Sequence, residues 1–340
     1  MRRGSIVQLL LFALVAGGVA TALAVVPGWL PHPASREAGR IDFVFWFVTV
    51  ICVAIFAIVA AVIVYSLLKF RVRPDDDSDG EPIHGHTGLE IAWTAVPTVL
   101  VIAIAVVSAI VLAKNGHAGS NALRVNVTGQ QFAWSFSYPD DGDVTSGVLR
   151  LPVNRSVNLY LRSRDTDVIH SFWVPEFSQK QDLLPGMTTH VVITPDRVGS
   201  YPVVCTELCG LGHSVMRTTA IVMPPQAFES WVNQQKKALA SGGANAGKAV
   251  FTSNGCASCH TFAPAGATGK TGPDLDKLAT EAKGAGKPLD DFVRESIVDP
   301  NAYVAPGYPK NVMPSTFAQL PKSQLDALVQ YLVQSKKGSK

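Results

Sequence analysis

The sequence has few charged side chains for its length. They make up 16% of its 340 residues, whereas an ordinary soluble domain contains about 25%. Apolar residues reach 47% and the mean hydropathy is +0.22. This composition excludes a disordered chain, because such chains are poor in apolar residues. The positive mean hydropathy and the low share of charged residues together disfavour a wholly soluble protein.

The sequence also lacks a strong net charge and contains little cysteine. Its 29 Lys and Arg against 26 Asp and Glu give a net charge of +3. That is too small to indicate binding to nucleic acid, and no basic stretch interleaved with aromatic residues supports it. Five cysteines in a chain of this length are too few for a disulfide scaffold. Four of them fall in two short motifs, so their positions are more informative than their number.

A first apolar run begins directly behind two arginines. Arg2 and Arg3 precede residues 6–26, and the small residues Ala22 and Ala24 stand near the end of the run. A positive start, an apolar centre and a small-x-small exit are typical of a secretory signal peptide. We therefore predict a signal peptide over residues 1–26. An uncleaved membrane anchor is the alternative, because the run is nearly long enough to span a bilayer.

Two longer runs, residues 43–68 and 91–113, contain no charged residue. Each exceeds the ~20 residues that a helix needs to cross a membrane. Lys69, Arg71 and Arg73 follow the first of these runs, which places the connecting loop in the cytoplasm. The sequence thus predicts a transmembrane hairpin over residues 41–113, with the rest of the chain outside the cytoplasmic membrane.

Glu90 stands at the cytoplasmic start of the second predicted span. Carboxylates at the edge of a membrane often belong to proton paths. A glutamate in the first turn of a helix is also favourable for structural reasons, because it faces the positive end of the helix dipole. From its position alone, the structural role is the preferred interpretation.

After the hairpin the chain changes character. From residue 120 to 224 short apolar stretches alternate with polar residues, as at Leu123 and Val125, and turn residues separate them. This pattern predicts a small β-sandwich or barrel. Residues 225–246 are predicted to form a helix followed by a flexible linker rich in Gly, Ala and Ser. Residues 247–340 are predicted to form a compact helical domain, since its last segment repeats apolar residues at helical spacing.

The first chemical motif lies near the end of the predicted β domain, in the run Cys205-Thr-Glu207-Leu-Cys209-Gly-Leu-Gly-His213-Ser-Val-Met216. Two thiols, an imidazole and a thioether on one loop favour copper in electron transfer over catalytic zinc or magnesium. Two thiolates can bridge two copper ions, and a second imidazole is then needed. His170 is the best candidate, since it lies between two strand-like stretches. A disulfide between Cys205 and Cys209 is the alternative.

At this point the sequence resembles subunit II of haem-copper cytochrome oxidases, with its binuclear CuA centre in a cupredoxin-like β-barrel. The resemblance covers roughly residues 42–239. It includes the hairpin, the His170 segment and the cysteine loop, together with the segments Leu89–Thr94, Gly129–Trp134 and Lys180–Gly186.

The resemblance implies a set of copper ligands: the side chains of His170, Cys205, Cys209, His213 and Met216, and the backbone carbonyl of Glu207. It also implies that the carboxylate of Glu207 faces a magnesium ion at the boundary with subunit I. Glu90 matches the glutamate at the mouth of a proton channel, which reverses the structural preference above. Phe132 replaces the tryptophan through which electrons usually reach the family's copper centre, while Trp134 keeps the neighbouring aromatic residue. This departure puts direct reduction by a soluble cytochrome in question.

The second chemical motif is Cys256-Ala-Ser-Cys259-His260. Two thiols two residues apart and a following histidine suit covalent attachment of haem, with the imidazole as iron ligand. Zinc binding or a redox dithiol are the alternatives for the motif alone. Met313 is the only methionine after it, and a thioether as the second axial ligand would raise the reduction potential. This part of the chain resembles a class I cytochrome c domain, which is an all-α fold.

The whole chain therefore resembles subunit II of oxidases with a fused cytochrome c, as in caa-type oxidases. The resemblance implies a multidomain bacterial membrane protein with both metal domains on the outer face. It implies electron transfer from an external donor through haem c and CuA to subunit I, in a proton-pumping oxidase that reduces O2 to water. Implied partners are subunit I, subunit III and a donor such as a cytochrome or a cytochrome bc complex. The alternatives are a CuA-containing nitric oxide reductase subunit and a copper-delivery protein.

Overall fold

The computed structural model describes residues 3–71, 75, 82, 84–241, 243–313 and 315–334. Some predicted features lie partly outside this range. They are Arg2 of the signal peptide, Arg73 of the cytoplasmic loop, Gly242 of the linker and residues 335–340 of the last domain. The chain divides into two compact units. One contains Met1–His32 and Gly39–Asn115, and the other contains Pro33–Ala38 and Gly116–Lys340.

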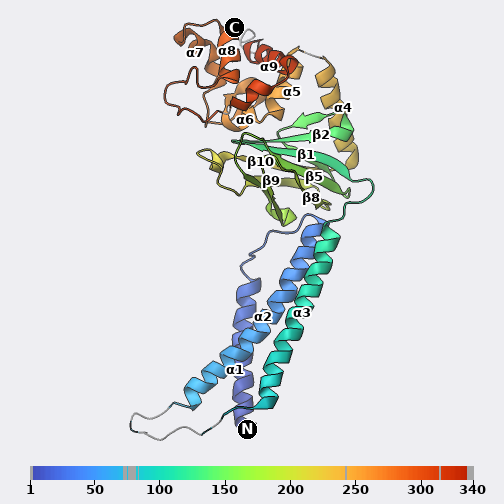
Figure 1. Cartoon of the computed structure of the whole chain (residues 1–340), viewed down its shortest axis with the longest axis vertical. Helices are drawn as coiled ribbons and strands as arrows, with labels where there is room; N and C mark the ends of the chain where they lie inside the picture. The colour runs from blue at the N-terminus through green and yellow to red at the C-terminus, as the bar shows by residue number, and fades with distance from the viewer. Residues whose placement is uncertain are drawn as a thin grey trace. The chain divides into compact units, whose positions relative to one another are not determined.

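The first unit contains three long helices, α1 (Arg3–Val25), α2 (Arg36–Lys69) and α3 (Thr87–Asn115) (Figure 1). All three are long and apolar enough to cross a membrane. Helices α2 and α3 contain the two predicted spans. The prediction of two membrane spans is not exact, because the segment assigned to a signal peptide forms a third helix that is long enough to cross a membrane. No charged residue and no proline interrupts this segment between Arg3 and Val25, so one helix over the whole run satisfies the backbone groups of its interior.

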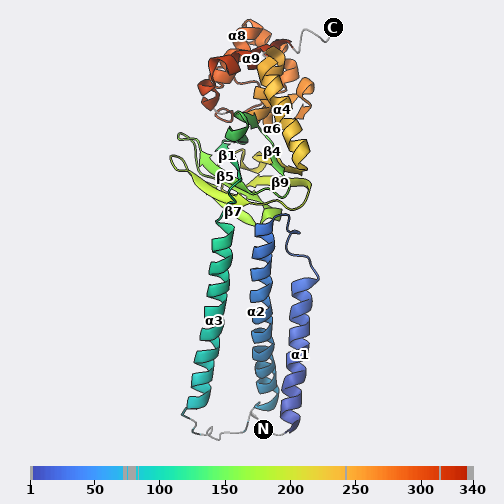
Figure 2. The ribbon, with the colours of Figure 1, turned by 90° about the vertical axis from the view of Figure 1, so that its right-hand side faces the viewer.

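Contacts between these helices are few but specific. A Cβ atom on Gly17 of α1 would lie 3.3 Å from the Cβ of Ala57 in α2. At the other end of α2, Arg40 Nε donates a hydrogen bond to Asn115 Oδ1 of α3 over 2.7 Å. Helices α2 and α3 lie close together at this end in both views, and Figure 1 shows them diverging towards their other ends (Figures 1 and 2). Most of their side chains remain exposed, as expected for helices that lipid or other subunits cover.

The second unit begins with a β-sandwich of two five-stranded sheets. The first sheet has the order β3 (Val144–Ser146), β2 (Ala133–Tyr138), β1 (Leu123–Gln130), β5 (Val157–Ser163) and β8 (Thr189–Ile193). The second has the order β4 (Leu149–Pro152), β10 (Arg217–Met223), β9 (Gly199–Cys205), β6 (His170–Val174) and β7 (Gln179–Leu183). The pairs β1–β5 and β4–β10 are parallel, and all other pairs in the two sheets are antiparallel. This cupredoxin-like arrangement agrees with the predicted β domain.

The alternation in the sequence explains the core of the sandwich. In β1, Leu123 and Val125 are buried while Arg124 between them is exposed. Strand residues alternate between the two faces of a sheet, so one face of β1 contributes only apolar side chains. Trp134 and Phe172 add large aromatic rings to the same core, with their centroids 5.7 Å apart in an edge-to-face arrangement.

The rest of the second unit is mainly helical. It contains α4 (Pro225–Ser241), α5 (Gly243–Ser253), α6 (Cys256–Cys259), α7 (Leu278–Gly284), α8 (Leu289–Val298) and α9 (Lys322–Gln334). Short 3-10 turns cover Ala263–Ala265, Leu275–Lys277 and Ser315–Gln319 in this part, and Thr261–Phe262 pairs with Ala267–Thr268. Three further 3-10 turns, Pro139–Asp141, Pro175–Phe177 and His213–Val215, lie between strands of the sandwich. The core of the helical part centres on three aromatic rings, Phe251, Phe262 and Tyr331, whose centroids lie 5.5–6.1 Å apart.

The predicted flexible linker is wrong for residues 243–246, because α5 already begins at Gly243. Ala244 and Ala246 favour a helix, since alanine has the highest helix propensity. Gly247 serves packing rather than flexibility. A Cβ atom there would lie 2.0 Å from the carbonyl oxygen of Ala327 in α9, so only glycine allows α5 to approach α9 this closely.

Candidate copper and haem sites

The ends of strands β6 and β9 bring the predicted copper ligands together. His170 is the first residue of β6, and Cys205 is the last residue of β9. The two strands are neighbours, with Phe172 opposite Cys205, so the His170 side chain lies close to the Cys205 thiol. The loop from β9 to β10 then carries the remaining predicted ligands, which are Glu207, Cys209, His213 and Met216.

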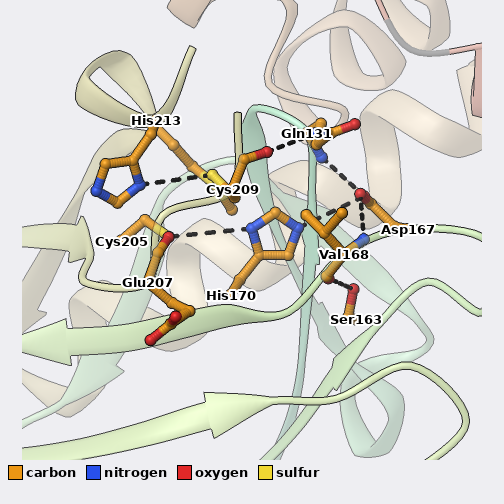
Figure 3. Close-up of polar contacts among 10 residues, drawn as sticks. Gln131, Ser163, Asp167, Val168, His170, Cys205, Glu207, Cys209 and His213 are labelled. Carbon is orange, nitrogen blue, oxygen red and sulfur yellow. Dashed lines mark hydrogen bonds and ion pairs between the residues drawn. The ribbon is translucent and has the colours of Figure 1, made fainter. Parts of the chain in front are cut away.

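Figure 3 shows how the side chains of His170, Cys205, Cys209 and His213 converge. The Cys205 Sγ lies 3.9 Å from His170 Nδ1 and 3.3 Å from the carbonyl oxygen of Glu207. The Cys209 Sγ lies 3.5 Å from His213 Nδ1 and 3.8 Å from Met216 Sδ. One ligand atom each from His170, Cys205 and Cys209 falls within 4.8 Å of the others. The structure therefore brings together every residue of the predicted set.

The chemistry of this donor set fits copper. Two thiols, two imidazoles, a thioether and a carbonyl oxygen are the soft and intermediate donors that copper electron-transfer sites use. Cys205 and Cys209 are buried free thiols, so the alternative of a disulfide is not what the structure shows.

A buried carboxylate orients the histidine. His170 is fully buried, and its Nε2 lies 3.5 Å from Asp167 Oδ2. The same carboxylate accepts hydrogen bonds from the backbone N–H groups of Gln131, over 2.8 Å, and Val168, over 2.7 Å. With Nε2 turned to Asp167, Nδ1 is the ring nitrogen that faces Cys205. Partners of this kind fix the tautomer and the ring orientation of a metal-binding histidine.

Asp167 and Gln131 were not predicted as parts of the site. Asp167 could have been suspected, because an acid three residues before the candidate ligand His170 can reach its ring. Gln131 gave no such signal, since its partners Asp167 and Cys209 lie 36 and 78 residues away along the chain.

The surroundings shift the pKa values of the site in opposite directions. Burial disfavours the charged form of both His170 and Cys205, but their mutual contact outweighs it, together with the Asp167 carboxylate at His170 and backbone hydrogen bonds at Cys205. The pKa of His170 is therefore raised, and that of Cys205 is lowered. Burial and the neighbouring charge of Cys205 raise the pKa of Cys209. Like charges that share a small buried site resist ionising together, so the metal-free pair favours one thiolate and one thiol.

The second predicted set lines an apolar cavity in the helical domain. Cys256 and Cys259 form the ends of the short helix α6, and His260 follows it directly. All three line the cavity together with Met313. The sequence therefore identified four residues, distant by up to 57 positions, that the fold brings to one cavity.

The histidine of this cavity is held in one orientation. His260 Nδ1 donates a hydrogen bond to the carbonyl oxygen of Pro273 over 2.8 Å, which leaves Nε2 as the nitrogen with a free lone pair. A Cβ atom on Gly272 would lie 2.6 Å from the ring Cε1 of His260, so glycine is required beside the ring. Burial lowers the pKa of His260 and thereby favours the neutral imidazole that binds a metal. Two thiols, this imidazole and a thioether around an apolar cavity fit a covalently held haem.

One wall of this cavity comes from the β-sandwich. Gln131, Phe132 and Ala133 line it from the turn between β1 and β2. Phe132 is 5% exposed and Trp134 is 2% exposed. The aromatic patch that was predicted to accept electrons is therefore buried, and Phe132 faces the cavity of the chain's own helical domain.

Glu90 lies in the other unit, in the first turn of α3. One of its carboxylate oxygens accepts a hydrogen bond from the backbone N–H of His86 over 3.1 Å. His86 Nδ1 in turn accepts from the N–H of Leu89 over 3.2 Å. These contacts satisfy orphan donors at the start of the helix, so Glu90 has a structural role whatever its further role.

Comparison with known proteins supports the order of the domains. The family "Cytochrome C oxidase subunit II, transmembrane domain" matches residues 25–111, and "Cytochrome C oxidase subunit II, periplasmic domain" matches residues 146–223. The family "Cytochrome c" matches residues 244–336. The chain is thus a membrane protein with two domains outside the membrane, and its families imply binding of copper and haem c.

Curated relatives extend the match over most of the chain. A "Cytochrome c oxidase subunit 2" of Synechocystis sp. is 35% identical over 252 residues, which are 60% of this chain and 75% of the relative. The protein of the same name from Alkalihalophilus pseudofirmus is 31% identical over 297 residues, which are 84% of both chains. Such a subunit works in an oxidase with other subunits, where its role is electron transfer. The chain therefore belongs to the cytochrome c oxidase subunit 2 family and carries, in addition, a C-terminal cytochrome c domain.

Proposed function

We propose that the chain receives electrons from an external donor at its cytochrome c domain and passes them through its CuA domain to the haem of subunit I. The oxidase so supplied reduces O2 to water and pumps protons. The observation that carries this order is the apolar cavity that the haem motif and Phe132 of the sandwich line together. A donor that cannot reach the buried Phe132 must deliver its electron to the helical domain first.

The geometry of the two sites supports the proposed ligands. In the CuA domain they are His170, Cys205, Cys209, His213, Met216 and the carbonyl oxygen of Glu207. In the cytochrome c domain, Cys256 and Cys259 would hold the haem covalently, with His260 and Met313 as the axial ligands of its iron. Copper and haem, when bound, supply centres that take up and release one electron.

The copper loop is also the proposed contact with subunit I. Leu208 and Leu211 at its tip are 80% and 85% exposed, and exposed apolar side chains of this kind indicate a surface that a partner covers. Glu207 is exposed beside them, so its carboxylate is available to a magnesium ion at that boundary. Subunit III and a cytochrome or cytochrome bc complex as donor complete the proposed partners.

The membrane unit supplies the anchor and the proposed proton entrance. We assign the mouth of the proton channel to Glu90, which is exposed in the first turn of α3. We further infer that α1 is a signal peptide that is removed, since the transmembrane family begins its match only at residue 25, the last residue of α1. The mass of the mature chain tests this inference. A mass that still includes Met1 would show a bacterial membrane protein with three spans instead of two.

A reduced-minus-oxidised visible spectrum tests the proposal as a whole. The complex should be purified from native membranes through this chain. We expect c-type and a-type haem bands together, and oxygen uptake with a reduced cytochrome. Bands of c-type and only b-type haem would favour a nitric oxide reductase or a b-type oxidase. A complex without any second haem, whose copper a chelator removes readily, would overturn the proposal in favour of copper delivery.

A further inference from the structure

The cytochrome c domain is docked on the β-sandwich by close backbone contacts. Gly147 lies between β3 and β4, and a Cβ atom on it would come within 2.3 Å of the carbonyl oxygen of Thr252 in α5. Gly255 has a positive φ of 70°, and a Cβ atom there would lie 2.7 Å from the Cβ of Ala133. Two glycines are therefore needed for the two domains to approach each other at this distance.

Apolar side chains close the same contact beside the haem cavity. Val312, the neighbour of Met313, packs against the core of the sandwich. Phe132 lines the cavity from the opposite domain. On its other side, the Phe132 ring occupies the space over the copper loop, since a Cβ atom on Gly212 would lie 2.4 Å from the ring. Phe132 thus separates the haem cavity from the copper loop by the thickness of one ring.

Gln131 joins the two sites through hydrogen bonds. Its side chain lines the haem cavity, and its Nε2 donates to the carbonyl oxygen of Cys209 over 2.5 Å (Figure 3). Its backbone N–H donates to Asp167, the carboxylate that orients His170. Gly210 leaves the necessary space, since a Cβ atom there would lie 2.9 Å from Gln131 Nε2. One residue at the cavity wall therefore contacts the supports of two proposed copper ligands.

We propose that Gln131 is the positioning residue that couples the haem cavity electronically to the copper site, through its hydrogen bond to the Cys209 carbonyl. This inference rests on the proposed function. One electron leaves the cytochrome c domain, which is oxidised, and enters the CuA domain, which is reduced by one electron. No bond is made or broken and no proton is transferred. The side chain of Gln131 and its hydrogen bond provide a path over part of the distance between the two sites. The electron then has a shorter distance to cross through space.

The first test removes the hydrogen bond and keeps the volume. In the purified complex a flash reduces haem c, and the rates of electron exchange with CuA are followed optically. Gln131→Leu should slow the forward and reverse rates several-fold and by the same factor, because it changes the coupling and not the driving force. The matched control is Gln179→Leu, which removes the bond from Gln179 Nε2 to the Val192 carbonyl and should leave both rates unchanged. Equal rates in the Gln131 and Gln179 variants would overturn the proposal.

The second test measures the docking of the two domains by hydrogen exchange, without any assay of turnover or electron transfer. Gly147→Ala should force α5 away from the sandwich, because a backbone oxygen cannot yield as a side chain can. Hydrogen exchange of the full chain should then become faster in residues 129–135 and 250–256 together. Unchanged exchange in both segments would overturn the docking on which the coupling depends. The proposed function fails separately, if the chain without substitutions shows no c-type haem or copper spectrum. Equal rates in the two variants would overturn the role of Gln131 and leave the proposed function intact.

Discussion

The indole of Trp134 donates a hydrogen bond from Nε1 to the backbone carbonyl of Met216 over 3.3 Å. The same carbonyl accepts a hydrogen bond from the N–H of Cys205 over 3.2 Å. One buried oxygen therefore joins strand β2, the end of β9 and the end of the copper loop. The two ends of the loop are bonded to each other, and a residue of the aromatic core is bonded to one of them.

Replacing Trp134 by phenylalanine should weaken the attachment of the copper loop to the aromatic core. The variant loses one hydrogen bond and part of a buried ring, which should destabilise the β-sandwich by about 1–3 kcal/mol. Loss of copper absorption during urea unfolding in detergent measures the effect. Trp173→Phe, in strand β6 of the other sheet and only half-buried, is the control. Equal losses in the two variants would show that the bond to Met216 contributes nothing of its own.

Asp167→Asn should weaken the binding of copper. The asparagine side chain is uncharged and has one acceptor oxygen instead of two. It cannot replace the carboxylate both at His170 Nε2 and at the backbone, so the ring loses its fixed orientation. Loss of such outer partners typically lowers metal affinity by about 10–100-fold, which competition with a copper chelator measures. Asp165→Asn is the matched control, because Asp165 lies on the same loop with its side chain 66% exposed. An unchanged affinity of the Asp167 variant would contradict the orienting role.

Met313→Leu should keep the covalent haem and lose one axial ligand. The reduction potential of the haem should fall, within the range of about 0.8 V that axial ligands span in proteins, because a thioether favours the reduced iron. Redox titration of the c-type band measures this change. Met187→Leu, at a methionine that is 57% exposed in the sandwich, should leave the potential unchanged. A potential that does not move in the Met313 variant would assign the ligand elsewhere.

Gly272→Ala should prevent proper seating of the proximal histidine. The added methyl group would meet the His260 ring at 2.6 Å and push it away from its bond to Pro273. We expect a much smaller yield of covalently attached haem, measured by haem staining of the denatured chain. Gly284→Ala adds the same methyl group at the end of α7, with its nearest atom, the Tyr303 hydroxyl, at 3.8 Å. That control should attach haem normally.

Acid should weaken the packing of α8 against α9. Asp326 accepts hydrogen bonds from Lys322 and Arg294, at 2.8 and 2.7 Å, and both lower its pKa. A carboxyl with a lowered folded pKa stabilises the fold above its unfolded pKa of about 3.9, and this contribution disappears as the pH falls through the folded value.

Asp326→Asn should therefore remove part of the acid sensitivity. Its thermal midpoint should lie slightly below that of the unchanged domain at neutral pH, and the two should converge as the pH falls to about 3. Asp291→Asn, an exposed acid in the first turn of α8, is the charge-matched control. A constant difference between Asp326→Asn and the unchanged chain at every pH would contradict the ion-pair explanation.

Local patterns were sufficient for those parts of the molecule whose residues are close in sequence. The alternation around Val125 predicted a strand, and the spacing of Cys205, Cys209 and His213 predicted one metal loop. Contacts between distant segments had no such pattern. Nothing near Gln131 indicated that its amide would reach Cys209.

The glycines also show that contacts between distant segments cannot be predicted from local sequence. Gly247 and its small neighbours suggested a flexible connection, because composition alone cannot distinguish a glycine that bends from one that permits close packing. Only the position of α9 shows which applies. Gly147 and Gly255 likewise give no signal of the partner surface that requires them.

The burial of Phe132 and Trp134 separates two tasks that a bare copper domain must perform on one surface. The cavity wall inside the chain faces a single, permanent neighbour, so its residues are free to serve electronic coupling alone. In the proposed electron path, discrimination among external donors falls to the outer surface of the cytochrome c domain. Substitutions there could change the donor that the oxidase accepts without altering any atom around the copper loop.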